Sequence, residues 1–340
     1  MTHPNPHICA ILLAAGKGTR MKSKLPKVLH EVAGTPILSR ILHTLRSSGV
    51  QQHCLVLGGD LQNFDGILKE NSDITCVIQK NRRGTGDAVA SALCAFEGYN
   101  VPSYASGEVY AGSVVNASHV LISAGDTPAL SAKVLSDFVE RSLAEDAKLS
   151  VIGMRHPKPF GYGRLVVNDG TLDKIVEEKD ADAETRKINL CNTGVIFAET
   201  KFLFDLVHQL NNNNAQGEYY LTDCFELARE QGSPAMVFET EEFRSFDGVN
   251  NRSQLCQIED WIIAQKRLEL MQEGVTFKLQ DTCYVEDQVS IGPDSTIGPH
   301  CSLIGHTKIG ANCVIGAQCI IENQILPDGT VIEPGSVLRT

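Results

Sequence analysis

The stretch ICAILLAAGKGTRMKSKLPKVL, residues 8–29, carries the clearest signal of the fold of this chain. It opens with an unbroken apolar run, Ile8–Ala15, of the length expected for a strand that is buried on both faces of a parallel sheet. The run ends in the loop GKGTR, residues 16–20, whose two glycines allow a tight turn and leave backbone N–H groups unshielded. A buried strand that ends in a glycine-rich, cationic loop predicts a polyphosphate site at the carboxyl ends of the strands.

Two common nucleotide-binding motifs do not fit this loop. A P-loop needs a glycine five residues before the Gly16-Lys17 pair, and this chain has Ile11 there. The dinucleotide-binding fingerprint needs a third glycine where Met21 stands. For the loop alone, a surface turn with incidental lysines stays open as the alternative.

Composition narrows the class of protein. The chain has 340 residues, enough for two domains, and a formal net charge of −11, which argues against nucleic acid as a partner. Its eleven cysteines include no C-x-x-C pair and no spacing typical of a metal site. Since the sequence shows no signal peptide and no apolar run of membrane-spanning length, we expect a cytoplasmic protein with reduced thiols and no membrane contact.

Strand and helix patterns alternate after the first loop. Thr35-Pro36 followed by an apolar helical face predicts a helix that is capped by Thr35 and stops at Gly49. The pattern then predicts strands at 54–57, 74–78 and 119–124, and helices at 61–69 and 84–96. This alternation indicates an α/β fold with a parallel sheet and crossover helices. Residues 99–118 show no regular pattern, so we expect a surface excursion there.

Polar residues and glycines follow these strands. Gln79 precedes Gly84-Thr85-Gly86 at a helix start, where free N–H groups can meet a base edge or an anion, or can simply cap the helix. Asp126 follows the strand 119–124, where a carboxylate can hold Mg²⁺ against phosphate oxygens. The alternative for Asp126 is a helix cap, but Ser131 fits that role better.

A hairpin is predicted next, with polar residues at its root. The turn Asn168-Asp169-Gly170 joins strands at 165–167 and 172–176, and a charged run at 177–180 and a strand around Asn192 follow. Polar residues at strand ends suit recognition of sugar hydroxyls, although a charged run on its own is more often a solvated face. We further predict a helix that begins at Thr222 and a long amphipathic helix after Asn250. For Asn250, a role as the cap of this helix and nothing else stays open.

From Leu279 the apolar period is six residues. Aliphatic residues recur at this interval at positions 279, 285, 291, 297, 303, 309, 315 and 321. Small or β-branched residues follow each of them by four positions, from Cys283 to Ile325. The pattern predicts a β-helix of hexapeptide repeats.

The end of the repeat region departs from this pattern. The aliphatic register fails at Pro327 and Glu333, while the second series continues through Val331 and Val337, so we expect the end of the β-helix to act as a cap. Three residues of the second series, Cys283, Cys301 and Cys319, are 18 residues apart. We expect them to stack on one corner, about 4.8 Å apart, as free thiols.

The motifs, taken in order, resemble those of a known family. LLAAGKGTRM and LPKVL resemble the signature of the sugar-1-phosphate nucleotidyltransferases. Within that group the chain is similar to the bacterial N-acetylglucosamine-1-phosphate uridyltransferases through GTGDA, GDTP, GYGR, VEEKDA, NTG, GEYYLTD and GVNNR. The resemblance covers residues 8–326. It implies a Rossmann-like domain with a mostly parallel mixed sheet at 1–250, a connecting helix at 251–275 and a short left-handed β-helix at 276–340.

The resemblance also implies a reaction and its residues. UTP and N-acetylglucosamine 1-phosphate would give UDP-N-acetylglucosamine and pyrophosphate with Mg²⁺, for peptidoglycan and lipopolysaccharide precursors. Arg20 and Lys27 are implied as catalytic residues, and Asp126 and Asn250 as ligands of Mg²⁺. The implied substrate-binding residues are Leu13, Ala14, Ala15, Gly16, Gly18, Gln79, Gly84 and Thr85 for the nucleotide, Gly163 or its neighbour Gly161, Glu177, Asn192, Tyr220 and Thr222 for the sugar, and Asn250.

Some features depart from the family or leave alternatives open. Asp87 stands where related sequences often have His, and residues 99–118 look like an insertion. The alternatives are a nucleotidyltransferase for glucose 1-phosphate or N-acetylgalactosamine 1-phosphate, a hexapeptide acyltransferase with His300 or His306 as the base, and a regulatory nucleotide-binding protein. Because the β-helix is short, we expect no acetyltransferase activity. We also expect the β-helix to join subunits into a homotrimer.

Overall fold

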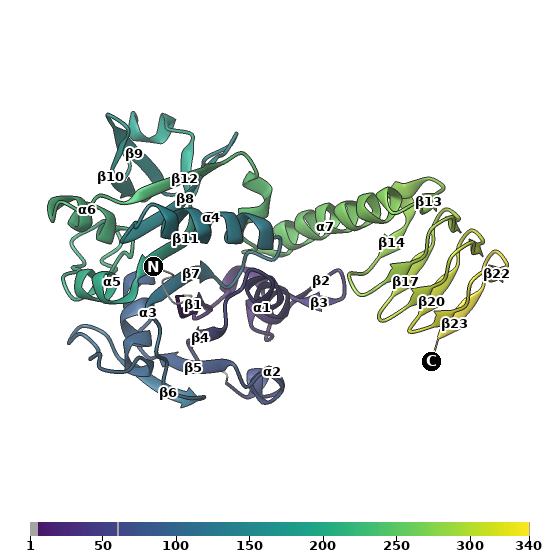
Figure 1. The fold of residues 1–340 in the computed structure, drawn as a ribbon, viewed down its shortest axis with the longest axis horizontal. Coiled ribbons are helices and arrows are strands. Elements are labelled where there is room, and N and C mark those ends of the chain that lie inside the picture. The colour runs from purple at the N-terminus through teal and green to yellow at the C-terminus, as the bar shows by residue number, and fades with distance from the viewer. Residues whose placement is uncertain (1–5, 60, 340) are drawn as a thin grey trace. The chain divides into compact units, whose positions relative to one another are not determined.

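The computed structural model describes residues 6–59 and 61–339, which divide into two compact units (Figure 1). The first unit comprises Met1–Val28 and Leu38–Gly248, and the second comprises Leu29–Ile37 and Val249–Thr340. The second unit therefore includes the connecting helix and a short segment near the N-terminus that the sequence placed in the first domain.

The first unit is built on a ten-stranded mixed sheet with the strand order β10-β9-β11-β7-β1-β4-β5-β6, and β8 pairs with β11 and β12. Its centre is parallel and contains β7 (His119–Ala124), β1 (Ile8–Leu13), β4 (Gln52–Leu57) and β5 (Ile74–Gln79). The remaining strands are β6 (Gly107–Ala111), β8 (Leu149–Arg155), β9 (Arg164–Asn168), β10 (Thr171–Val176), β11 (Leu190–Glu199) and β12 (Met236–Thr240). The predicted α/β fold is confirmed, including the β9–β10 hairpin.

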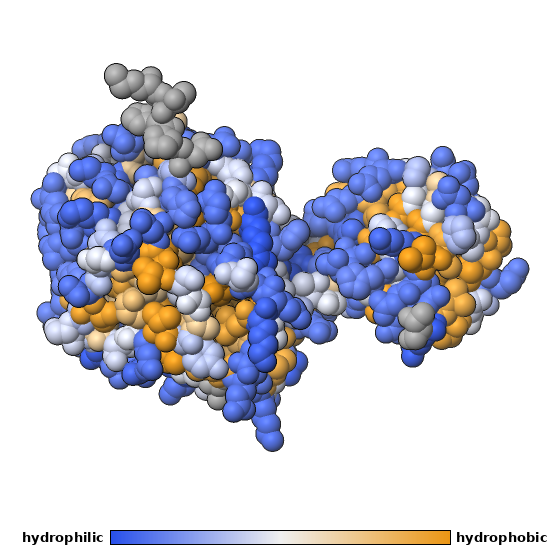
Figure 2. Space-filling model, turned by 60° about the horizontal axis from the view of Figure 1, so that its bottom comes forward, coloured by the Kyte–Doolittle hydropathy of each residue, from blue (hydrophilic) through white to orange (hydrophobic). Residues whose placement is uncertain are grey.

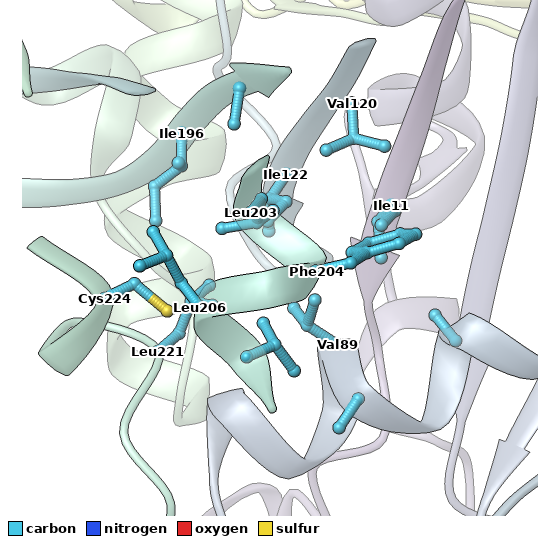
Figure 3. Packing of buried hydrophobic residues seen from close by; sticks show 14 of the residues in the cluster. Ile11, Val89, Val120, Ile122, Ile196, Leu203, Phe204, Leu206, Leu221 and Cys224 are labelled. Carbon is cyan, nitrogen blue, oxygen red and sulfur yellow. The ribbon is translucent and has the colours of Figure 1, made fainter. Parts of the chain in front are cut away.

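Helices cover both faces of this sheet. They are α1 (Ile37–Ser47), α2 (Asp65–Glu70), α3 (Thr85–Ala92), α4 (Ala132–Ala144), α5 (Thr200–Val207) and α6 (Asp223–Glu230). Figure 3 shows the core on one face, where Val89 of α3 and Phe204 of α5 pack against Ile11 and Ile122 of the central strands. Helix α4 packs through Phe138 on the rings of β11 and β12. Burial on both faces explains why β1 reads as a continuous apolar run.

Two local predictions in this part of the chain were wrong. Thr35 does not cap a helix, because Thr35–Pro36 forms strand β3, which pairs with β2 (Glu31–Val32) across a turn at Ala33 and Gly34 with positive φ. The backbone carbonyl of His30, not the Thr35 side chain, accepts from the first helical N–H, that of Ile37. The segment 99–118 is also not purely irregular, since it contains edge strand β6, antiparallel to β5.

The second unit begins with the β2–β3 hairpin and the long helix α7 (Arg252–Gln272). The cap of α7 is Asn251, whose side chain accepts from the backbone N–H of Gln254, so Asn250 is not the capping residue. Glu259 on α7 accepts from the backbone N–H of Ala33 at 3.0 Å, which ties the hairpin to the helix. Further along α7, buried Arg267 donates to the carbonyl of Cys283 at 2.7 Å and holds the helix against the first coil.

Short parallel strands stack in three ladders to form the β-helix, in agreement with the predicted left-handed β-helix. The first ladder is β13 (Thr276–Phe277), β16 (Thr296–Ile297), β19 (Val314–Ile315) and β22 (Val331–Ile332). The second is β14 (Tyr284–Val285), β17 (Ser302–Ile304), β20 (Ile320–Glu322) and β23 (Val337–Arg339), and the third is β15 (Ser290–Ile291), β18 (Lys308–Ile309) and β21 (Ile325–Leu326).

The inward series was correct in the middle of the repeats and wrong at both ends. Val285 to Ile321 are buried at the predicted interval, whereas Leu279 is 69% exposed. Near the end, one turn is shorter by a residue: Ser290 pairs with Lys308, 18 residues later, but Lys308 pairs with Ile325, 17 residues later. Leu326, Ile332 and Leu338 therefore continue the inward series, and Ile325, Val331 and Val337 point outward.

This shift overturns the predicted cap. Pro327 and Glu333 do not occupy inward positions, because each follows an inward residue of the shifted series. Strands β22 and β23 continue the ladders on β19 and β20, so the parallel β-helix extends to Arg339.

The cysteine prediction was confirmed. Cys283, Cys301 and Cys319 are buried free thiols that directly precede β14, β17 and β20 of one ladder. Each thiol contacts a backbone carbonyl of the next turn of the β-helix, as Cys283 does with Gly298 at 3.3 Å.

Apolar side chains also appear on the outer surface of the β-helix (Figure 2); the exposed ones include Val314, Ile325, Val331 and Val337.

Candidate functional site

A cavity of about 410 Å³ lies where the parallel strands of the first unit end. Its walls come from the loop after β1, the end of β5, the start of α3 and the loop after β7. The residues that line it are Leu13, Ala14, Ala15, Gly16, Lys17, Lys27, Val28, Gln79, Arg82, Gly84, Thr85, Ala88, Ala124, Asp126 and Glu218. The carboxyl edge of a parallel sheet is the usual place for a ligand in such folds.

One wall of the cavity carries charge. Lys27 donates to the carboxylate of Asp126, which follows β7, and both side chains are mostly shielded from solvent. Gly18 lies behind Lys27: its φ is +58°, and a Cβ there would lie 2.9 Å from Cβ of Lys27. Gly18 therefore shapes the loop around the lysine, whereas Gly16, with open space around it, faces the cavity.

The opposite wall is the turn before α3. The Gln79 amide donates to Asp87 at 2.6 Å and to the carbonyl of Gly84 at 3.3 Å. Gly84 has a φ of +109°, and a Cβ there would come within 2.5 Å of the carbonyl oxygen of Tyr219. The turn is thus packed tightly against a segment more than 130 residues away in sequence. The Thr85 hydroxyl adds a hydrogen bond to this segment, since it accepts from the backbone N–H of Leu221 at 3.1 Å.

A second polar cluster gathers the residues assigned to the sugar. The Thr222 hydroxyl donates to Glu177 at 2.9 Å, and the Asn192 backbone N–H donates to the carbonyl of Gly163 at 2.8 Å. A Cβ on Gly163 would lie 3.5 Å from the Glu177 carboxylate, so three of these residues are immediate neighbours. Tyr220 donates to Asp180 at 3.1 Å on the same side. Gly161, the alternative to Gly163, is exposed in the preceding loop.

The electrostatics of this cluster are acidic. Burial raises the pKa of Glu177 above its usual range, the Thr222 hydroxyl opposes the shift, and Asp180 adds to it. Burial, together with neighbouring Glu226 and Glu177, raises the pKa of Asp223 to about 6. Carboxylates grouped in this way are suited to accept hydrogen bonds from neutral hydroxyl groups.

A single segment connects the cavity with the acidic cluster. Glu218 lines the cavity, the backbone of Tyr219 bonds to both Arg83 and Gly86, and Thr222 reaches Glu177. Sequence motif and structure agree here, since this segment is the stretch GEYYLTD. The segment allows a ligand to contact both groups of residues through neighbouring positions of one chain segment.

Two parts of the chain match known protein families. Residues 10–185 match the MobA-like NTP transferase domain, and residues 281–323 match the bacterial transferase hexapeptide, with six repeats. The chain belongs to the MobA-like NTP transferase family.

Similar curated proteins carry one name. The Bifunctional protein GlmU of Rhodospirillum rubrum is 38% identical over 288 residues, which is 84% of this chain and 59% of that protein. The Bifunctional protein GlmU of Rhodopseudomonas palustris is 39% identical over 285 residues, with the same two shares. That of Limosilactobacillus fermentum is 36% identical over 289 residues, again 84% of this chain and 59% of its own length. The chain thus spans less than two thirds of the relatives it matches.

Not every predicted residue lines the cavity of this family member. Leu13, Ala14, Ala15, Gly16, Lys27, Gln79, Gly84, Thr85 and Asp126 do. Arg20 is exposed in a short 3₁₀ turn, Thr19–Met21, just beyond the loop, and is not among the lining residues. Asn250 belongs to the second unit, so its part in binding Mg²⁺ stays a prediction.

Six lining residues are not among the site residues assigned from the sequence: Lys17, Val28, Arg82, Ala88, Ala124 and Glu218. Arg82 has a positive φ of 46° and donates to the carbonyl of Gly58, which fixes its guanidinium at the rim. The available signal for it was the pair of basic residues, Arg82-Arg83, that precedes the Gly84-Thr85 turn. Glu218 was visible only as part of a motif.

Proposed function

We propose that the chain transfers a uridylyl group from UTP to N-acetylglucosamine 1-phosphate and releases pyrophosphate. The observation that carries the proposal is the cavity, which has lysines and an exposed glycine loop at one wall and Gln79 with a helix start at the other. These two walls suit the triphosphate and the base of one nucleotide. Similarity to proteins named GlmU supports this choice among the reactions of the family.

The chain's own residues mainly orient the substrates and neutralise phosphate charge. Backbone N–H groups of the loop at Gly16 bind phosphate oxygens, and Lys27 offsets negative charge at the reacting phosphate. An oxygen of the sugar phosphate attacks the α-phosphorus; the new P–O bond forms as the bond to the β-phosphate breaks and pyrophosphate leaves. Since the attacking phosphate is already ionised near neutral pH, no strong general base is needed. Alignment of the two substrates then dominates the rate.

Mg²⁺ is part of this proposal, and Asp126 fits it. The described residues hold no group of three or more His, Cys, Asp or Glu side chains arranged around a metal. Mg²⁺ does not require one, because it prefers one or two protein carboxylates together with substrate phosphates and water. The Asp126 carboxylate lines the cavity at the end of β7, where the triphosphate would lie. When bound, the ion would neutralise phosphate charge.

The sugar is assigned from the acidic cluster. Glu177, Thr222 and Asn192 would receive the hydroxyl and N-acetyl groups, which present several donors and acceptors. To test this choice, pyrophosphate release is measured with UTP and each of N-acetylglucosamine, N-acetylgalactosamine and glucose 1-phosphates. We expect the first to give the highest kcat/KM, and a preference for glucose 1-phosphate would replace the sugar assignment.

The alternatives gain less support. His300 and His306 are both exposed on the β-helix, and neither lines the cavity at the ends of the parallel strands. A cap at the end of the β-helix was one argument against acetyl transfer, and the structure has no such cap at Pro327. The expected lack of acetyl transfer stays a prediction for these 340 residues. Glucosamine 1-phosphate with acetyl-CoA should release no CoA above background. Turnover of UTP separates an enzyme from a regulatory nucleotide-binding protein.

Assembly and surroundings complete the proposal. We propose that the exposed apolar residues of the β-helix, Val314 and Val331 in one ladder and Val337 in another, support association as a homotrimer. Among the described residues, none of the helices combines the length and apolarity needed to cross a membrane. We retain the cytoplasm and cell-wall precursor synthesis as the proposed setting.

A further inference from the structure

Asp87 is a fully buried carboxylate in the first turn of α3 that lies behind the cavity and does not line it. One carboxylate oxygen accepts from the Gln79 side-chain amide at 2.6 Å and from the backbone N–H of Arg83 at 3.1 Å. The second oxygen is buried and has no hydrogen-bond partner among the described residues. Because burying a carboxylate in this way is costly, the burial of Asp87 calls for a role.

The chemistry of the carboxylate fixes which way the Gln79 amide points. An ionised carboxylate can only accept hydrogen bonds, so Gln79 must turn its NH₂ group toward Asp87. The carbonyl of Gly84 also accepts from this NH₂ group, at 3.3 Å. Both amide hydrogens of Gln79 are then used within the protein. The amide oxygen is the group of Gln79 that is left for a ligand, and Gln79 lines the cavity beside Gly84 and Thr85.

The surroundings of Asp87 support a fixed arrangement. The Arg83 guanidinium lies 3.8 Å from the second carboxylate oxygen and 5.4 Å from the centre of the Tyr219 ring. The ring of Tyr104 stacks on Tyr219 at 4.0 Å, and the Tyr104 hydroxyl donates to the carbonyl of Val207 at 2.6 Å. The segment 99–118 therefore braces the turn that holds Asp87 in place.

We propose that Asp87 is a positioning residue that makes the cavity select a base with an N–H donor at ring position 3 over a base with an acceptor there. Uracil has such a donor, and cytosine has an acceptor at the same atom, so Asp87 would favour UTP over CTP through the oxygen of Gln79. This inference rests on the proposed function, because it concerns the nucleotide of the same site. A site built to pair one hydrogen-bonding pattern rejects the reverse pattern strongly.

The test replaces Asp87 by leucine, which has a similar size and accepts no hydrogen bond. In Asp87→Leu the Gln79 amide loses the acceptor that holds its NH₂ group, so it can reverse and offer NH₂ to the base. We measure kcat/KM for UTP and for CTP at saturating sugar phosphate, in the full chain. The ratio of the two values should fall by at least about tenfold, because reversal penalises one base and favours the other. Exposed Asp137→Leu on α4 is the matched control and should leave the ratio unchanged.

A purely structural role for Asp87 predicts another result. Loss of structure lowers kcat/KM for both nucleotides together, so an unchanged ratio in folded Asp87→Leu would overturn the inference. If this variant does not fold, the wild-type chain still decides: it should discriminate against CTP and against UTP methylated at N3. Equal use of these nucleotides and UTP would refute an acceptor at Gln79.

The inference and the proposed function can fail separately. If the wild-type chain turns over no nucleotide, the proposed reaction is wrong, but calorimetric binding of UTP and CTP still measures the preference. Tighter binding of UTP that is lost in Asp87→Leu supports the positioning role, and equal binding of both nucleotides contradicts it.

Discussion

The two ends of the candidate site differ in the kind of group that meets the ligand. The cavity end offers backbone, a glutamine amide and the cations Lys17, Lys27 and Arg82. Its two carboxylates are Asp126, which is paired with Lys27, and Glu218. The other end groups the carboxylates Glu177, Asp180 and Asp223 with hydroxyl groups. Cations and open N–H groups suit phosphates, whereas carboxylates repel phosphates and suit hydroxyl donors. The difference supports the proposal that the cavity end takes the nucleotide triphosphate and the other end takes the neutral part of the sugar.

The largest effect is expected at Asp126. Asp126→Asn removes a charge at the cavity wall and should lower kcat on the order of 10²-fold or more, as loss of a preorganised charged group does. The measurement is steady-state pyrophosphate release at several Mg²⁺ concentrations, with exposed Asp137→Asn as the control. Unchanged turnover at limiting Mg²⁺ would remove Asp126 from the cavity's chemistry.

A smaller loss is expected at the cations of the same end. Lys27→Ala should lower kcat by about tenfold or more and change the KM for UTP less, because the charge that it meets develops during transfer. Arg20→Ala should show the same pattern if its exposed side chain reaches the phosphates once they bind. Lys24→Ala, an exposed lysine of the same loop, serves as the control. An effect on KM alone would assign both residues to ground-state binding.

The other end should respond through the sugar phosphate. Glu177→Gln keeps the shape of the side chain but weakens acceptance from hydroxyl groups, so the KM for N-acetylglucosamine 1-phosphate should rise roughly fivefold. The KM for UTP should stay within error, and Glu184→Gln, exposed on the following loop, should change neither. A rise in the KM for UTP instead would erase the distinction between the two ends.

The smallest effect concerns stability at the acidic end. The pKa of Asp223 is raised from 3.8 to about 6, so the folded state binds its proton more tightly than the unfolded state does. The contribution of Asp223 to the free energy of unfolding is therefore lost as the pH rises from about 4 to about 6, and it stays lost at higher pH. Thermal unfolding across this range should show the wild type losing stability relative to Asp223→Asn. A constant difference between the two curves would show that Asp223 is not perturbed.

Local pattern predicted the parts of the fold that neighbours in sequence determine. The strand Ile8–Leu13, the strand before Asp126 and the hairpin at Asp169-Gly170 each follow from a short run of residues. The walls of the cavity were predicted because glycines and charged residues at strand ends are meaningful in any parallel sheet. The roles of Arg20, Glu177 and Asn192 stay predictions, although the last two lie in one cluster.

The errors share a physical cause, which is pairing between distant segments. The shortened turn at Asn323-Gln324 moved the inward series by one position, as the strand pairing of Lys308 with Ile325 shows. A signal was present, since Leu326, Ile332 and Leu338 are themselves six residues apart. The contact of Asp87 with Gln79 depends on how β5 turns into α3, so the sequence showed an unusual residue without its role.

The most direct test of the account follows the α-phosphorus of UTP. The chain is incubated with UTP labelled at that atom, N-acetylglucosamine 1-phosphate and Mg²⁺, and the products are separated. The account predicts that all transferred label appears in UDP-N-acetylglucosamine, with unlabelled pyrophosphate released in equal amount. Label in free UDP or UMP, or no consumption of UTP that depends on the sugar phosphate, would contradict uridylyl transfer by this cavity.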